Sequence, residues 1–152
     1  RGGHTAAMRN GIDTEPEARR FYEMHCNITV RQVGFVLHDS ERFGSSPDFL
    51  TEGDFPGELK CPQPNTHISY LRKGVLPTEY RPQCHGHLIV CEKPYCDFMS
   101  YCPGLPPLIV RVERDAYTEL LREALEQFLE RFAAAKRSLG IPEVTAEGEV
   151  VS

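Results

Sequence analysis

The sequence predicts one domain of the α/β or α+β class, with a central mixed β-sheet flanked by helices. Segments with helical periodicity, at both ends and in the middle of the chain, alternate with short segments rich in β-branched residues. The chain has 152 residues, 40% of them hydrophobic, which suffices for one domain with its own core but not for two ordinary ones. We expect residues 1–140 to form this domain and residues 141–152 to form an acidic, disordered tail.

The first predicted helix follows residues 1–13, which show no clear element. Thr14 is a suitable N-cap, and the helix is expected to run from there to about Cys26. Pro16 is tolerated in a first turn, and Glu17 completes a T-x-x-E capping box with Thr14.

Extended segments come next. Residues 28–39 are rich in β-branched residues and predict one strand, bent at Gly34. Residues 45–50 resume an extended conformation, because Pro47 disfavours a helical backbone in the residue before it. After a tight reversal, residues 58–61 form a short strand, so that a hairpin is expected here.

The second half of the chain predicts helices on both sides of a pair of strands. The expected elements are, in order, a helix at 64–73, a helix from Pro77 to Val90, strands at 95–102 and 107–115, and a long helix that begins at Asp115 and ends before Gly140 and Pro142. Apolar residues recur at helical spacing in the last helix, and we expect this stripe to pack into the core. The stripe consists of Tyr117, Leu120, Leu121, Ala124, Leu125, Phe128, Leu129 and Phe132.

Composition and charge narrow the classes of function. The formal net charge of −5 argues against broad non-specific binding to nucleic acid, although a local basic groove is compatible with it. No segment approaches the length of a membrane span and no signal peptide is visible, so we expect a cytoplasmic protein that does not bind membranes. The chain has enough apolar residues to fold without disulfides, so its six cysteines are expected to be free thiols.

The expected hairpin carries the residues with the most chemical interest. Asp48 and Glu58 fall on neighbouring strands, and alternation puts Glu58 and Lys60 on one face with Leu59 on the other. A divalent hard cation prefers oxygen ligands, which Asp48, Glu58, the backbone carbonyl of Leu59 and Glu15 of the first helix could supply. Lys60 would then meet the attacking water and the phosphate.

The same short pattern also fits an ordinary hairpin. In that interpretation Asp48 occupies a Pro-Asp turn, and Glu58 and Lys60 form an exposed ion pair on a strand edge. For an arbitrary sequence this is the better interpretation, so the flanking residues have to decide.

The flanking residues resemble the YqaJ-type viral recombinase family, a group of lambda-exonuclease-type alkaline exonucleases in the PD-(D/E)XK nuclease superfamily. The resemblance runs in order from about Gly11 to Ser138 and implies a restriction-endonuclease-like core for residues 1–140. The segments that carry it are GIDTEPEARRFYE, SSPDFL, GELKCPQPNTH, EYRPQCHGHLIV, CDFMSYCPGLPPLIVRVERD and the final helix.

The resemblance implies roles for individual positions. Asp48, Glu58 and Lys60 match the family's catalytic triplet, in which the two acids hold Mg²⁺ or Mn²⁺ and the lysine acts on the nucleophilic water. Leu59 lies between them in the chain, and Glu15 matches a helix glutamate that aids the metal site.

Three further positions match residues that contact DNA in the family. Ser46 matches a serine that helps to hold the 5′-phosphate of the DNA end, and Gln83 lies in the family's Tyr-x-x-Gln helix. His85 stands where the lambda-like pattern has a second glutamine, and either residue would face the scissile phosphate or order Lys60.

The function implied is a magnesium-dependent 5′→3′ exonuclease that degrades one strand of linear double-stranded DNA during phage-type homologous recombination. The implied setting is the cytoplasm of a bacterial or phage-infected host, with a homotrimer and a single-strand annealing recombinase as partner. Family members carry a segment before the first helix with a basic residue for the terminal phosphate. The chain begins at Arg1, so we expect part of this segment to be missing.

Alternative functions remain at this point. One is a non-catalytic module that binds DNA ends, and another is an endonuclease of the same superfamily. The complete triplet favours an enzyme, because a cluster of acids without metal repels phosphate. A zinc site is a further alternative: Cys84, His87 and Cys91 would share a helix face, but His85 points elsewhere and no paired C-x-x-C motif is present.

Overall fold

The computed structural model describes residues 6–144 and 150–151. Its helices are α1 (Ala6–Cys26), α2 (Pro64–Lys73), the short 3-10 helix η1 (Thr78–Tyr80), α3 (Arg81–Cys91) and α4 (Ala116–Ser138). Its strands are β1 (Val30–Arg31), β2 (Val36–Leu37), β3 (Gly44–Ser45), β4 (Phe49–Thr51), β5 (Pro56–Lys60), β6 (Tyr95–Ser100), β7 (Leu108–Glu113), β8 (Glu143–Val144) and β9 (Val150–Val151). No helix in the described ranges combines the length and the apolar character that a membrane crossing requires.

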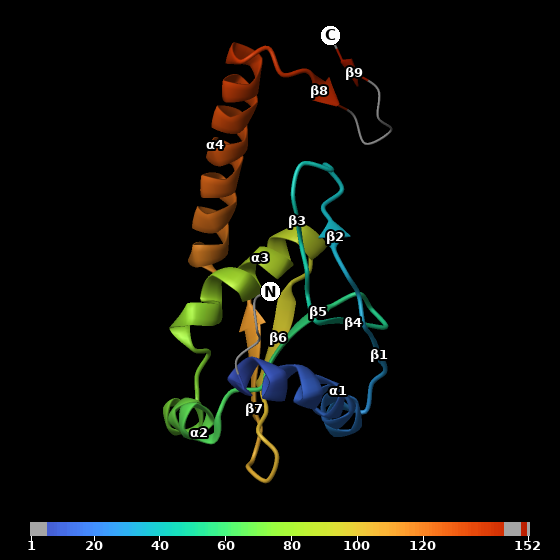
Figure 1. Ribbon diagram of the computed structural model, residues 1–152, viewed down its shortest axis with the longest axis vertical. Coiled ribbons are helices and arrows are strands. Elements are labelled where there is room, and N and C mark those ends of the chain that lie inside the picture. The colour runs from blue at the N-terminus through green and yellow to red at the C-terminus, as the bar shows by residue number, and fades with distance from the viewer. Residues whose placement is uncertain (1–5, 145–149, 152) are drawn as a thin grey trace.

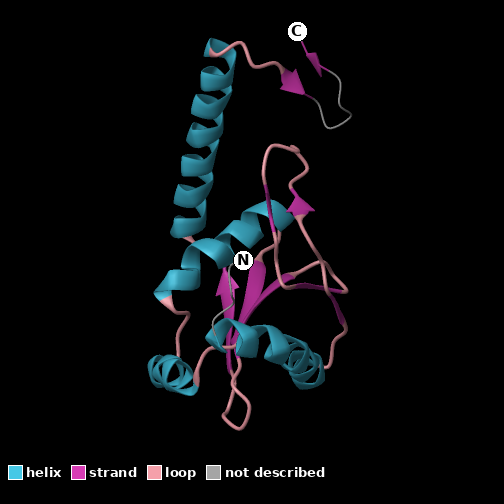
Figure 2. Ribbon diagram, viewed as in Figure 1, coloured by secondary structure: helices cyan, strands magenta, loops and turns pink. Residues whose placement is uncertain are grey.

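A five-stranded sheet with the order β1-β4-β5-β6-β7 forms the centre of the fold (Figure 1). β5 and β6 run parallel, with Glu58 opposite Phe98 and Lys60 opposite Ser100. The other neighbouring pairs in this sheet are antiparallel. Helices border the sheet (Figure 2), so the predicted α/β class with a mixed sheet is confirmed.

The two faces of the sheet contribute to separate hydrophobic clusters, because side chains alternate along β5 and β6. On one face Leu59 packs with Tyr22 of α1. On the other face Phe98 packs with Leu88 of α3. α1 and α3 therefore cover opposite faces, and Glu58, the neighbour of Leu59 in the strand, lies on the α3 face.

The first helix begins earlier than predicted. α1 starts at Ala6, so Thr14 and Pro16 lie inside the helix and the predicted capping box of Thr14 with Glu17 is wrong. Alanine, methionine and arginine, which occur before Thr14, are good helix formers and extend the helix past the capping pattern. Pro16 lacks an N–H and therefore removes one hydrogen bond from the helix interior.

The predicted strand at 28–39 is in fact two short strands that join different sheets. β1 pairs with β4 in the central sheet, whereas β2 pairs with β3 in a separate two-stranded sheet. The β-branched composition of the segment indicated extended backbone correctly. It contained no information on the pairing partner, which is decided by segments more distant in the chain.

The long C-terminal helix begins as predicted. The carboxylate of Asp115 accepts hydrogen bonds from the backbone N–H groups of Tyr117 and Thr118, and the Thr118 hydroxyl accepts from the N–H of Asp115. This reciprocal capping box fixes the start of α4.

The apolar stripe of α4 is not a core, contrary to the prediction. Thr118 is the helix's buried residue, whereas Leu120, Phe128 and Phe132 are 64%, 55% and 50% exposed. Only the first part of the helix lies near α3, and the rest extends away from the sheet (Figure 1). Helical spacing predicted an amphipathic helix, but it cannot specify what covers the apolar side.

Within the predicted disordered tail, the structure describes residues 141–144 and 150–151. Glu143–Val144 and Val150–Val151 form an antiparallel pair, which the valines favour as β-branched residues. Residues 145–149 and 152 lie outside the described ranges, so the disorder expected for residues 141–152 stays a prediction.

Candidate active site

The β4–β5 hairpin brings two acidic residues side by side. Phe49 pairs with Gly57 in the antiparallel register, so Asp48, one residue earlier, stands opposite Glu58. The N–H of Asp48 donates to the carbonyl of Gly57 over 3.0 Å. A Cβ on Gly57 would lie 1.9 Å from Cζ of Phe49, so only glycine lets the ring pack here. The predicted hairpin is confirmed, and its register sets the spacing of the two acids.

Asp48 is a partly buried carboxylate in a negative environment. Its Oδ2 accepts a hydrogen bond from the backbone N–H of Leu59 over 2.7 Å. Burial, followed by the charge of Glu58, raises the pKa of Asp48 to about 6. The charge of Glu15 adds to this increase, while the Leu59 hydrogen bond and Lys60 oppose it. A carboxyl group under these influences stands where additional positive charge is favourable.

Glu58 is almost completely buried, at 1% exposure. Its Oε2 lies 2.7 Å from Nε2 of His87. Its Oε1 forms an ion pair with Nζ of Lys60 at 2.7 Å, but no described group donates a well-formed hydrogen bond to this oxygen. A buried carboxylate requires compensation by positive charge, and the ammonium group of Lys60 supplies it at Oε1.

Lys60 lies on the same face as Glu58, as predicted, and its ammonium group also lies 5.0 Å from the ring centre of Tyr80. Burial alone lowers the pKa of Lys60. The contact with Glu58 and the charges of Glu58 and Asp48 outweigh burial, so the pKa of Lys60 is raised overall. Lys60 is therefore a positively charged donor in this site.

His87 belongs to the site, although the sequence indicated it only as an alternative zinc ligand. The ring is 2% exposed, with Nε2 at Glu58 and Nδ1 3.0 Å from Oγ of Ser45. Gln83 precedes His87 by four residues in α3 and therefore shares its helix face. The spacing of four residues could have predicted that His87 belongs to the site, because it places His87 on the helix face that carries Gln83.

Two of the predicted DNA-contacting residues are accessible. Ser46 is exposed next to the buried Pro47, immediately before Asp48. Gln83 is exposed in the first turn of α3, on the face of His87. Both side chains are therefore accessible from solvent, and their contacts with DNA stay a prediction.

His85 points away from Glu58 and Lys60, whereas the resemblance implied that it or Gln83 would face the scissile phosphate or order Lys60. Its Nδ1 lies 2.7 Å from Oγ1 of Thr118, and its ring contacts Tyr117 edge to face. Burial lowers the pKa of His85, although Asp115 opposes this effect. The ring is 2% exposed and helps to attach α4 to α3. The physical reason is the helical period, which directs positions 85 and 87 to different sides of α3.

Glu15 lies on α1 and forms an ion pair with Arg19 at 2.9 Å. Across residues 6–144 and 150–151, no three His, Cys, Asp or Glu side chains are placed to hold a metal ion together. The observed cluster offers two carboxylates, and Mg²⁺ is commonly held by one or two because it keeps several waters. Asp48 and Glu58 thus offer a set of ligands that fits such an ion, and the charge of Glu15 acts on Asp48.

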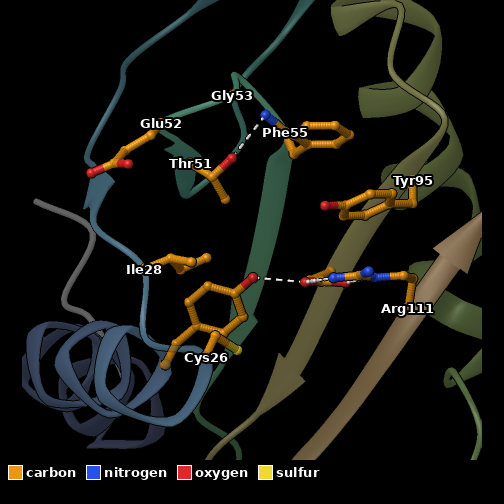
Figure 3. Close-up of a pocket in the computed structure, with 10 residues that line it drawn as sticks. Cys26, Ile28, Thr51, Glu52, Gly53, Phe55, Tyr95 and Arg111 are labelled. Carbon is orange, nitrogen blue, oxygen red and sulfur yellow. Dashed lines mark hydrogen bonds and ion pairs between the residues drawn. The ribbon is translucent and has the colours of Figure 1, made fainter.

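A second buried acid, on the α1 face of the sheet, shows the contrasting case (Figure 3). Asp97 is 5% exposed and receives hydrogen bonds from Nε of Arg111 at 2.9 Å and from Nη2 at 3.0 Å. The hydroxyl of Tyr22 donates to it over 2.7 Å, and Arg111 stacks on Tyr95. Both oxygens of Asp97 have donors, so this pocket holds a structural ion pair, in contrast to Glu58.

Solved structures of an alkaline exonuclease are similar to this chain. LHK-Exo, an alkaline exonuclease from Laribacter hongkongensis, is 30% identical, with a TM-score of 0.69 over 90% of this chain and 77% of its own. The structure of LHK-Exo in complex with dAMP is 32% identical, with a TM-score of 0.73 over 92% of this chain and 77% of its own. No curated protein sequence matches the chain.

The family match covers the site. A model described as the YqaJ-like viral recombinase domain matches residues 2–94, more than half of the chain. This range contains Asp48, Glu58, Lys60 and His87. The matches indicate a nuclease with the fold of the alkaline exonucleases, and the chain belongs to the YqaJ-like viral recombinase family.

Proposed function

We propose that this nuclease is a divalent-metal-dependent exonuclease that hydrolyses phosphodiester bonds at the ends of double-stranded DNA. One observation carries the proposal: Asp48 and Glu58 stand opposite each other on one hairpin, with the ammonium group of Lys60 2.7 Å from Oε1 of Glu58. The membership of the chain in a family with alkaline exonuclease structures supports the reaction class.

The metal site in this proposal uses oxygen ligands from the hairpin. Asp48, Glu58 and the backbone carbonyl of Leu59 would hold Mg²⁺, for which Mn²⁺ can substitute, and Glu15 would support it from α1. The bound ion would polarise a phosphate oxygen and lower the pKa of a water molecule. The positive charge would also counter the burial and the charge of Glu58, which together raise the pKa of Asp48.

Lys60 acts in this proposal as a charged donor. Its ammonium group would hold the attacking water and stabilise the negative charge that grows on the phosphate in the transition state. The raised pKa of Lys60 supports this role, because the group stays protonated and does not act as the base.

The substrate contacts are proposed for two exposed polar side chains. The hydroxyl of Ser46 would donate to the terminal 5′-phosphate, and the amide of Gln83 would contact the phosphate next to it. The dAMP complex of LHK-Exo supports this class of ligand, since a nucleoside monophosphate is what an exonuclease releases. Neutral donors suit a site whose other groups are mainly acidic.

The finer properties of the proposal rest on the resemblance of the motifs. They are 5′→3′ degradation of one strand, a role in phage-type recombination in the bacterial cytoplasm, and work with a single-strand annealing recombinase. Three copies of the chain would form the active homotrimer, and exposed apolar residues of α4 such as Phe128 offer a surface that assembly would cover. Residues 1–140 would be the nuclease domain and residues 141–152 a tail outside it.

A digestion experiment tests the proposal. We expect Mg²⁺-dependent loss of linear duplex DNA with a 5′-phosphate, release of mononucleotides, and no activity in chelator or on closed circular DNA. Cutting of circles would indicate an endonuclease of the same superfamily. Stable binding of ends without digestion in Mg²⁺ or Mn²⁺ would indicate a non-catalytic DNA-end-binding module.

A further inference from the structure

His87 contacts both Glu58, a proposed metal ligand, and Ser45 at the end of β3. The residue after Ser45 is Ser46, the proposed contact of the 5′-phosphate. We propose that His87 is a positioning residue that holds Glu58 in one orientation and thereby sets the metal affinity of the site. The inference rests on the proposed function, because it concerns the same metal site.

The ring of His87 is fixed at both nitrogens. Nε2 lies 2.7 Å from Oε2 of Glu58, and because a carboxylate only accepts hydrogen bonds, Nε2 must carry the proton. Nδ1 lies 3.0 Å from Oγ of Ser45, and in the neutral ring this nitrogen accepts from the hydroxyl. His87 and Glu58 are only 2% and 1% exposed, so water does not compete for these contacts.

The contact makes the two oxygens of Glu58 unequal. Oε2 is engaged by His87, whereas Oε1 faces Lys60 without a well-formed hydrogen bond. Without His87, Oε2 would lose its donor in a buried place, and the carboxylate would turn both oxygens toward Lys60. His87 therefore fixes which oxygen of Glu58, Oε1, faces Lys60 and the place proposed for the metal ion.

The second contact ties this orientation to the DNA side of the site. Ser45 ends β3, and the next residue is Ser46, the proposed contact of the 5′-phosphate. A single imidazole thus joins α3, β3 and β5. Partners that orient a metal ligand in this way commonly change metal affinity or activity about 10-fold to 100-fold when they are removed.

A purely structural role is the alternative, and the same helix offers a matched control. His85 lies two residues away, is also 2% exposed and also contacts a hydroxyl, that of Thr118, but it points away from Glu58. Replacing His85 with Gln should lower the melting temperature without changing the affinity for metal. The His85 variant therefore shows the effect of disturbed helix packing alone, without loss of the contact with Glu58.

The experiment is a calorimetric titration of Mn²⁺ alone into the full chain, without DNA. We expect His87→Ala to weaken Mn²⁺ binding by about 10-fold to 100-fold. His87→Gln should recover most of the affinity, because the Gln amide nitrogen can donate to Glu58 from nearly the place of Nε2. His87→Met, similar in size but without a donor, should behave like His87→Ala and replaces it if the alanine variant does not fold.

The outcomes separate this inference from the proposed function. Parent-like Mn²⁺ affinity in the Ala or Met variant, with affinity lost in Asp48→Asn, would overturn the role of His87 and leave the metal site standing. Equal affinities of His87→Met and His87→Gln would also overturn it. Absence of Mn²⁺ binding to the parent chain would overturn the proposed metal site, and this inference with it.

Discussion

Replacing Asp48 with Asn should stabilise the metal-free protein while abolishing DNA cleavage. The substitution keeps the shape of the side chain and an acceptor for the N–H of Leu59, but it removes a negative charge. Burial and the charge of Glu58 both disfavour that charge in the folded state. The charge of Asp48 therefore serves the proposed metal site but makes the metal-free protein less stable.

The size of the effect follows from the pKa of Asp48, which rises from 3.8 to about 6 on folding. That difference corresponds to about 3 kcal/mol of destabilisation when the group is charged in both states. Because the folded state binds the proton more tightly, stability falls as the pH rises from 3.8 to about 6 and then levels off. The neutral amide of Asn accepts a weaker hydrogen bond from Leu59, which costs about 1 kcal/mol of stability. The expected net gain in the free energy of unfolding is therefore about 2 kcal/mol.

Urea unfolding in chelator, at about pH 8 and about pH 4, measures this gain, since the midpoint and slope together give the free energy of unfolding. The Asn variant should be more stable at the higher pH, and the difference should shrink at the lower one. Added Mg²⁺ should stabilise the parent and not the variant, because only the parent binds it well. A variant less stable than the parent at both pH values would refute the reasoning.

Three other substitutions test separate parts of the description. Lys60→Ala should slow single-turnover cleavage by about 100-fold to 1,000-fold, because it removes a charge that stabilises the transition state. It should also lower the melting temperature, because the buried Glu58 loses the cation paired with it; a parent-like rate would contradict the role of Lys60 in cleavage. Gly57→Ala should reduce the free energy of unfolding by about 1–3 kcal/mol. The reason is that its Cβ would lie 1.9 Å from the Phe49 ring, so an unchanged calorimetric melting temperature would contradict the hairpin register. Phe128→Ser combined with Phe132→Ser should lower the mass measured by light scattering if α4 joins copies, and a trimer that persists would place the interface elsewhere.

The core of the site was predictable because it is local in sequence. Pro47, the tight reversal and the alternation of Glu58, Leu59 and Lys60 define a hairpin over a few residues, and the structure contains it. The start of α4 was predictable for the same reason, because the capping residue Asp115 bonds to residues only two and three positions later in the chain.

The misplaced and missed residues depend on partners far away in the chain. His87 becomes part of the site only when α3 packs on the face of the sheet that carries Glu58, which is 29 residues earlier. His85 was assigned to the wrong side of the same helix, and its partner is Thr118 of α4. The sequence contains these residues in a clear helical order, but not the direction in which the helix docks.

The amino-acid sequence by itself determined the α/β class, most of the helices, the hairpin with its two acids and lysine, and the resemblance to the family to which the chain belongs. Tertiary structure alone decided how residues 28–39 divide between two sheets, which α3 histidine meets Glu58, and that part of the apolar side of α4 stays exposed. The physical reason is that turns, caps and side-chain alternation depend on near neighbours in the chain. Strand pairing and burial depend on which distant surfaces meet.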